Sequence, residues 1–171
     1  MKGHTTMEKF NLVKTIEQRA TVEKRYAVLV DYLAHCTAEQ RARASSIFGL
    51  QLNVGIVIEA TLNPDGRQNA QREGEPSRGD IIIEIMGKRY ACEIKALSKK
   101  SSASDAQNGT LAPLTLLFFY DNNGYCARLG RSCDVRVALK GGKRVIKYQD
   151  NIENFGKPID IHNVKTYALA H

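Results

Sequence analysis

The sequence predicts a mixed α/β (α+β) fold in which helices precede a mostly antiparallel sheet. The stretch Met7–Cys36 contains neither Gly nor Pro, and its apolar residues recur at steps of three and four, as on one face of a helix. From residue 79 onward, short β-branched and apolar segments alternate with turns rich in Gly, Asn and Asp. We therefore expect one domain of 171 residues, mainly helical over 1–62 and mainly β-sheet over 79–171.

Two further helices follow the first one. Thr37 and Gln40 form a capping-box pattern, in which each side chain bonds a backbone N–H at the helix start. The helix that they open is expected to run from about residue 38 through residue 50. Another helix is predicted over Val54–Leu62, and the turn signal Asn63-Pro64-Asp65-Gly66 ends it.

The second half of the chain reads as strands. Asp80–Met86 and Arg89–Ala96 are predicted to pair as a β-hairpin that turns at Gly87-Lys88. Leu114–Tyr120 is almost wholly apolar, which is typical of a central strand buried on both faces. The remaining expected elements are strands at Tyr125–Leu129, Val135–Leu139, Arg144–Tyr148 and Val164–Leu169, with exposed loops at Arg67–Arg78 and Lys99–Gly109.

Composition fits a soluble globular protein. Hydrophobic residues make up 43% and charged residues 25% of the chain, which is enough apolar material for a core. No apolar run approaches the roughly 20 residues that a membrane-spanning helix needs. The segment Met1–Phe10 lacks the apolar core of a secretory signal, so we expect a cytoplasmic protein without a membrane partner. The four cysteines form no C-x-x-C pair and are expected to be reduced thiols.

The net charge of +7 favours a polyanionic partner, and DNA is the partner that we expect. Cationic and amide side chains suited to bases and phosphates gather in the polar loop, just after the predicted hairpin and in the later strands. The candidate DNA-binding residues are Arg67, Gln71, Arg72, Arg78, Lys99, Lys100 and Arg144. A flexible loop and a solvated charged face remain the alternatives for these positions.

Three chemically active residues gather on the predicted hairpin. Glu93 and Lys95 are two apart on one strand, so their side chains share a face. A turn at Gly87-Lys88 brings Asp80 close to Lys95. Two carboxylates form a hard oxygen site suited to Mg²⁺, for which Mn²⁺ can substitute, and the carbonyl of Ile94 is a further candidate ligand. A lysine beside such a site can orient or deprotonate water, or stabilise a phosphorane-like transition state.

This arrangement resembles the PD-(D/E)xK nuclease superfamily. The resemblance rests on Gly79-Asp80, twelve intervening residues, and Glu93-Ile94-Lys95. It implies a restriction-endonuclease-like fold, with a central mixed β-sheet flanked by helices, and Mg²⁺-dependent hydrolysis of phosphodiester bonds. It also implies that Asp80 and Glu93 are metal ligands and that Lys95 is the catalytic lysine.

Two positions extend or depart from the superfamily pattern. Many members carry a glutamate on a helix before the hairpin, and Glu59 fits this place, although it could simply face solvent at a helix end. Where the superfamily name implies a proline before the aspartate, this chain has Gly79. A literal Pro64-Asp65 pair also exists, but no strand follows it, so it ranks below Gly79-Asp80.

The sequence thus predicts a metal-dependent endonuclease acting on DNA, with a type II restriction endonuclease as the first choice. Cutting both strands with one site per chain would favour a homodimer. A Holliday junction resolvase or a nicking repair nuclease comes next, and an RNA-directed nuclease is a further possibility. The alternative from another class is a basic nucleic-acid-binding module without chemistry.

Overall fold

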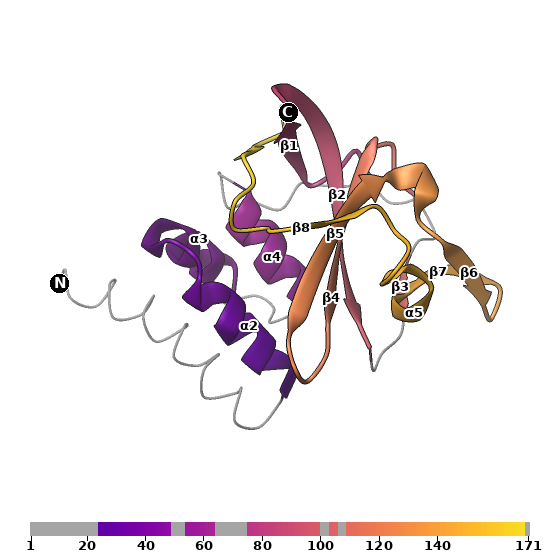
Figure 1. The fold of residues 1–171 in the computed structure, drawn as a ribbon, viewed down its shortest axis with the longest axis horizontal. Coiled ribbons are helices and arrows are strands. Elements are labelled where there is room, and N and C mark those ends of the chain that lie inside the picture. The colour runs from indigo at the N-terminus through magenta and orange to yellow at the C-terminus, as the bar shows by residue number, and fades with distance from the viewer. Residues whose placement is uncertain (1–23, 49–53, 64–74, 100–102, 106–108, 170–171) are drawn as a thin grey trace.

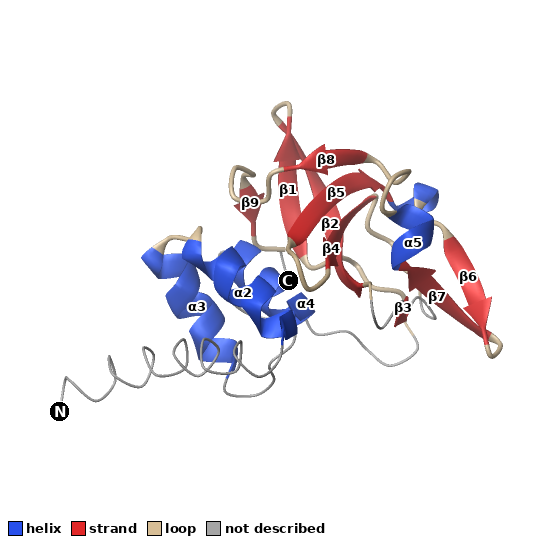
Figure 2. Ribbon diagram, turned by 60° about the horizontal axis from the view of Figure 1, so that its bottom comes forward, coloured by secondary structure: helices blue, strands red, loops and turns tan. Residues whose placement is uncertain are grey.

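Two sheets and a layer of helices organise the residues that the computed structural model describes, which are 24–48, 54–63, 75–99, 103–105 and 109–169 (Figure 1). The fold is mixed α/β, as predicted. The helices precede a curled, mixed sheet, and a smaller sheet lies on the other side of it (Figure 2).

Three helices form the first layer: α2 (Lys24–Ala34), α3 (Ala38–Phe48) and α4 (Val54–Leu62). The capping box before α3 is confirmed, since the Thr37 N–H donates to Gln40 Oε1 at 2.9 Å and the Gln40 N–H donates to Thr37 Oγ1 at 3.1 Å. Helix α4 has the predicted bounds, whereas residues 1–23 of the expected first helix lie outside the described residues. None of the described helices is both long enough and apolar enough to cross a bilayer.

The larger sheet is a mixed sheet of six strands in the order β8-β5-β4-β2-β1-β9. Strands β2 and β4 run parallel, and every other pair of neighbours is antiparallel. The strands are β1 (Ile81–Ile85), β2 (Lys88–Ser98), β4 (Leu114–Tyr120), β5 (Tyr125–Arg131), β8 (Lys157–Ile159) and β9 (Thr166–Tyr167). The central mixed sheet is therefore confirmed, and its core strand β4 has the predicted bounds.

The hairpin of β1 and β2 is confirmed, but its predicted register is wrong by two residues. Ile85 pairs with Lys88, so the turn is Met86-Gly87 and not Gly87-Lys88. Both turn residues have positive φ, 51° for Met86 and 79° for Gly87, as a two-residue turn that follows the right-handed twist of the strands requires. Ile81 pairs with Cys92, which places Asp80 next to Glu93 and not opposite Lys95.

Both faces of the larger sheet are buried, as strand β4 shows. Its even-numbered residues Leu116 and Phe118 pack in a cluster with the helices, while Leu117 and Phe119 pack in a second cluster on the other face. Because successive side chains of a strand point to opposite faces, a strand covered on both sides must be apolar throughout. This explains the continuous apolar run that identified the strand.

The second face is covered by a three-stranded sheet that the sequence did not predict as a separate layer. Its order is β3-β7-β6, with β3 at Ala103–Asp105, β6 at Val137–Lys140 and β7 at Lys143–Lys147. The short helix α5 (Tyr148–Asn151) follows β7, and both lie beside β3 and β6, away from helices α2 to α4 (Figure 1). The strands predicted at Val135–Leu139 and Arg144–Tyr148 are present and pair as the hairpin β6–β7, whereas β3 occupies a segment expected to be a loop. The α2–α4 layer thus flanks one face only.

Candidate active site between the two sheets

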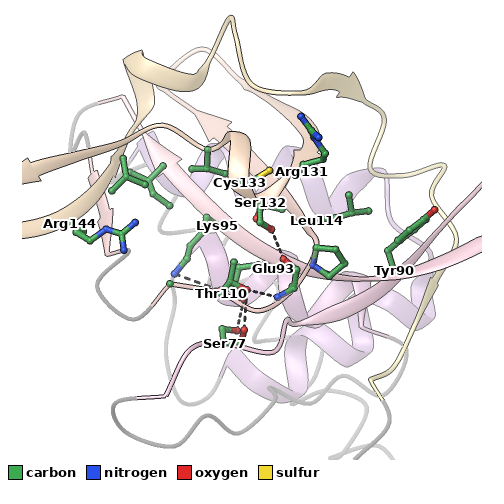
Figure 3. A pocket seen from close by; sticks show the side chains of 17 residues that line it. Ser77, Tyr90, Glu93, Lys95, Thr110, Leu114, Arg131, Ser132, Cys133 and Arg144 are labelled. Atoms are coloured by element: carbon green, nitrogen blue, oxygen red, sulfur yellow. Dashed lines mark hydrogen bonds and ion pairs between the residues drawn. The ribbon is translucent and has the colours of Figure 1, made fainter.

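Strand β2 carries the predicted chemical residues to the face that the smaller sheet covers. Ile94 is 7% exposed and packs in the helix-side core, so its neighbours Glu93 and Lys95 point to the opposite face. Both line a cavity of about 880 Å³ (Figure 3). The larger sheet, the segment before β4 and the smaller sheet all contribute walls. The lining residues are Ser77, Tyr90, Glu93, Lys95, Gly109, Thr110, Ala112, Pro113, Leu114, Thr115, Arg131, Ser132, Cys133, Val135, Val137, Arg144 and Ile146.

Glu93 is a buried carboxylate that is held by two partners. It is 6% exposed. The Ser77 hydroxyl donates a hydrogen bond to Glu93 Oε2, and Lys95 Nζ lies 3.7 Å from Glu93 Oε1. A buried charge is tolerated when it is paired and hydrogen-bonded, and these two contacts meet that need. They also fix the Glu93 carboxylate at the wall of the cavity.

Asp80 is the second carboxylate of the site and lies close enough to Glu93 to be affected by its negative charge. Burial, and then the negative charge of Glu93, raises the pKa of Asp80 to about 7. A hydrogen bond from the Ile94 N–H to Asp80 Oδ2, 2.7 Å long, and the charge of Lys95 act in the opposite direction. A cation beside Asp80 and Glu93 would relieve the repulsion between two neighbouring negative charges.

The donor set near this pair fits a magnesium ion. Mg²⁺ keeps several waters and uses one or two carboxylates together with substrate phosphates, so Asp80 and Glu93 meet its need. The N–H and C=O of one strand residue point to the same edge of the strand, and the Ile94 N–H points to Asp80. The Ile94 carbonyl therefore faces the same side. Among the described residues, no group of three His, Cys, Asp or Glu side chains gathers around a common point.

Ser77 is a residue of the site that the sequence analysis missed. Its carbonyl accepts hydrogen bonds from the Leu111 N–H at 2.6 Å and the Thr110 hydroxyl at 3.0 Å, and its hydroxyl accepts one from the Gly79 N–H at 3.2 Å. Ser77 thereby ties the segment before β1 to the segment before β4 while its hydroxyl holds Glu93. A serine in a polar loop carries no local signal for this role, because its partners are distant in sequence.

Gly79 explains why the chain departs from the superfamily pattern before the aspartate. Its φ is 109°, a conformation that glycine adopts readily. Proline is locked near −65° and cannot adopt it. A Cβ on Gly79 would also lie 3.2 Å from the Cys92 carbonyl oxygen. The path of the backbone into Asp80 therefore requires glycine in this chain.

The structure does not bring Glu59 to the cavity wall. Glu59 lies on the half-exposed side of α4, and α4 packs on the helix side of the sheet, where Ile94 is buried. Glu93 and Lys95 point to the other side of the same sheet. The catalytic role predicted for Glu59 stays a prediction.

The candidate DNA-binding residues fall into three groups. Arg144 is exposed on β7, lines the cavity and makes no ion pair with any residue that the structure describes. Arg78 and Lys99 are exposed, and the Lys99 N–H donates to the Tyr120 carbonyl at 3.1 Å. The others, Arg67, Gln71, Arg72 and Lys100, lie outside the described residues.

No family model, curated protein or solved structure matches this chain. The chemistry of the cavity itself is therefore the ground for a functional proposal. A carboxylate pair suits a divalent cation, and the ammonium group of Lys95 beside it suits a phosphate. On the smaller sheet, Arg144 adds a second cation that faces the same cavity (Figure 3).

Proposed function

We propose that this chain is a Mg²⁺-dependent nuclease that hydrolyses phosphodiester bonds in DNA. The observation that carries the proposal is the grouping of Asp80, Glu93 and Lys95 beside the middle of strand β2, with the pKa of Asp80 raised by burial and by the charge of Glu93. A carboxylate with a perturbed pKa beside a cavity is characteristic of a catalytic site, and Asp80 neighbours Glu93 at the cavity wall. A restriction-endonuclease-like fold is part of the same proposal, supported by the mixed sheet and the hairpin that carries the motif.

Each residue has a stated role in this proposal. Asp80, Glu93 and the Ile94 carbonyl would hold Mg²⁺, which supplies positive charge against the phosphoryl group and makes a water more acidic when bound. Lys95, 3.7 Å from Glu93, donates to a phosphoryl oxygen or orients the attacking water. Ser77 positions Glu93 through its hydrogen bond. Arg144 neutralises a substrate phosphate from the facing wall.

The decisive variant is Lys95→Ala, because Lys95 contributes chemistry in this proposal. We expect it to lower the cleavage rate by at least about 100-fold, the usual contribution of a positioned proton donor or acceptor. Lys88→Ala is the matched control, since Lys88 is an exposed lysine at the start of the same strand. Initial rates on one DNA substrate with Mg²⁺ measure both. Equal rates for Lys95→Ala and the wild type would remove Lys95 from the mechanism.

The class of nuclease is decided by its products. We propose a type II restriction endonuclease first, acting as a homodimer with one site per strand, and a junction resolvase or nicking repair nuclease second. Incubation with a long DNA and Mg²⁺, followed by sequencing of the fragment ends, separates them. Discrete ends support a restriction enzyme, and cleavage confined to branched DNA supports a resolvase. A measured mass near that of one 19.0 kDa chain would count against the homodimer.

A nucleic-acid-binding module without chemistry is the second candidate function. The net charge of +7 and the exposed cations Arg136, Lys140 and Lys143 favour it. In that case the protein binds DNA and leaves every DNA form intact with Mg²⁺ or Mn²⁺. Comparing DNA with RNA of the same sequence in the same assay also tests whether the substrate is RNA.

A further inference from the structure

The walls of the cavity combine cationic and apolar side chains, and a DNA duplex offers little apolar surface to contact the second kind. Lys95 and Arg144 are cationic and suit a phosphate. Between and beside them, the lining is apolar over a set of positions from both sheets and their connections. These apolar lining residues are Ala112, Pro113, Leu114, Val135, Val137 and Ile146, with the ring of Tyr90 in addition.

Glu93 and Lys95 line this cavity and do not lie on an open face. Glu93 is 6% exposed, and the Lys95 side chain is 28% exposed. The smaller sheet stands against them across the cavity, because Val137, Arg144 and Ile146 belong to β6 and β7 (Figure 3). A scissile phosphate must therefore enter between two walls to reach Glu93 and Lys95.

We propose that this cavity accepts an unpaired nucleotide, so that the preferred substrate is single-stranded DNA or an unpaired segment such as a flap or bulge. The inference rests on the proposed nuclease function for its choice of ligand. Within that function it favours a junction resolvase or nicking repair nuclease over a restriction endonuclease, because a restriction endonuclease must accept paired DNA. The cations bind the phosphate, while the apolar walls bind the base. The volume of about 880 Å³ lies in the range of roughly 300–1,000 Å³ that encloses small-molecule ligands.

Whether the bases are paired determines which form of DNA suits the cavity. In a duplex the bases are stacked inside, and a protein meets mostly sugar and phosphate unless a nucleotide is extruded at a cost of a few kcal/mol. In an unpaired strand every base exposes a flat apolar face to the protein. Apolar walls beside phosphate-binding cations therefore gain more from an unpaired nucleotide than from a duplex.

The hairpin β6–β7 continues the same mixture outward from the cavity. Val137 at the cavity is 38% exposed, and Leu139, two residues farther along β6, is 75% exposed. Lys140 and Lys143 flank the Gly141-Gly142 turn and are both exposed. Apolar side chains interleaved with cations are what a groove for single-stranded nucleic acid presents. This hairpin thus offers a continuous path for one strand.

Binding tests the inference without relying on cleavage. Fluorescence anisotropy in EDTA compares a labelled single strand, the duplex of the same sequence and a duplex with an unpaired bulge. We expect the single strand and the bulge to bind at least about tenfold tighter than the duplex, the size of one base stacked on protein. Equal binding, or tighter binding of the duplex, overturns the inference.

A pair of variants tests whether the cavity is the binding site. Val137→Asp puts a carboxylate at the cavity wall, and we expect it to weaken single-strand binding by about tenfold or more through repulsion of the phosphate. Met86→Asp makes the same charge change at an exposed apolar residue of the β1–β2 turn, outside the cavity and the β6–β7 path, and it is expected to weaken binding by about threefold or less. Equal losses in the two variants would show a general charge effect and would overturn the assignment. Circular dichroism checks that both variants are folded.

Cleavage with Mg²⁺ separates a failure of the inference from a failure of the proposed function. Faster cutting of the single strand and of the bulge than of the duplex supports both. Efficient cutting of the intact duplex overturns the inference while the nuclease proposal stands. Tight binding of the single strand without any cutting overturns the nuclease proposal, while the assignment of the cavity to an unpaired nucleotide stands.

Discussion

At the scale of single residues, Asp80 makes the stability of the protein depend on pH. Its pKa is raised to about 7, first by burial and then by Glu93, from an ordinary value near 3.8. Between these two values the folded state keeps a proton that the unfolded chain has released. The free energy of unfolding contributed by Asp80 therefore falls as pH rises from about 4 to about 7, and is constant above this window.

Asp80→Asn tests this dependence, because asparagine stays neutral and can still accept the hydrogen bond from the Ile94 N–H. We expect the variant to gain stability over the wild type as pH rises through the window and to lose cleavage activity. Urea unfolding at several pH values measures the difference between the two proteins, in which the titration of other carboxylates cancels. A difference that does not change with pH would contradict the raised pKa.

Gly79 gives a second prediction at this scale. Gly79→Ala places a side chain at φ 109°, with its Cβ 3.2 Å from the Cys92 carbonyl oxygen, so we expect a loss of stability on the order of 1–3 kcal/mol. Cleavage should also fall, because Gly79 leads directly into Asp80. Gly124→Ala is the matched control, since no atom lies within 4 Å of a Cβ at that position. Similar unfolding midpoints for the two variants would show that Gly79 is not strained by a side chain.

The residues of the candidate site were easier to predict from the sequence than the residues that hold them in place. Glu93 and Lys95 were recognisable because two residues of one strand share a face, a relation that depends only on local structure. The position of Asp80 beside Glu93 was missed by two residues because Met86, a residue without the freedom of glycine, adopts φ 51° in the turn. Ser77 could not be found, since its hydrogen bond to Glu93 spans sixteen residues.

At the scale of elements, strand β7 offers a test of whether its cavity-lining face contacts the substrate. Arg144 lines the cavity with Ile146, and Lys143 precedes it on the alternate position of the strand. We expect Arg144→Ala to lower kcat/KM by about 10- to 100-fold, the value of a hydrogen bond to a charged group. Lys24→Ala removes an exposed cation of α2, on the other face of the larger sheet and outside the proposed path, and should change kcat/KM by about twofold or less. Equal effects of the two variants would exclude a specific contact by Arg144.

Elements with a strong local pattern were predicted well, and elements that depend on distant partners were not. Strand β4 and helix α4 have the predicted bounds, because a run buried on both faces and a helix ended by a turn are visible in the sequence. Strand β3 was expected to be a loop. Its residues Ala103–Asp105 include no β-branched or aromatic side chain, and they form a strand because β7, about forty residues later, pairs with them.

At the scale of the whole molecule, the layer arrangement was only partly predictable. The helical and strand-rich halves follow from composition along the chain. The smaller sheet could not be predicted in this way, because it joins β3 from the middle of the chain to the later hairpin β6–β7. The residues of this sheet that face Glu93 and Lys95 belong to the hairpin β6–β7, which is far from β2 in sequence. The cavity is thus a product of tertiary packing, and no local pattern in the sequence announces it.

The distribution of charge over the molecule predicts how single-strand binding depends on salt concentration. A net charge of +7 alone would attract DNA to any face, whereas the proposed path places the contacts on the side of β6 and β7, at Arg136, Lys140, Lys143 and Arg144. For a single strand, the logarithm of the binding constant falls with the logarithm of salt concentration with a slope of about −0.7 per phosphate contact, so four contacts predict a slope near −3.

Anisotropy titrations of a labelled single strand at several salt concentrations measure this slope. Arg144→Ala should make it shallower by about 0.7, because one phosphate contact is lost. Lys24→Ala removes an exposed lysine at the start of α2, in the helix layer on the other face of the larger sheet, and should leave the slope unchanged. An equal change in both variants would mean that DNA responds to the total charge of the protein and follows no defined path past Arg144 to the Asp80–Glu93 pair.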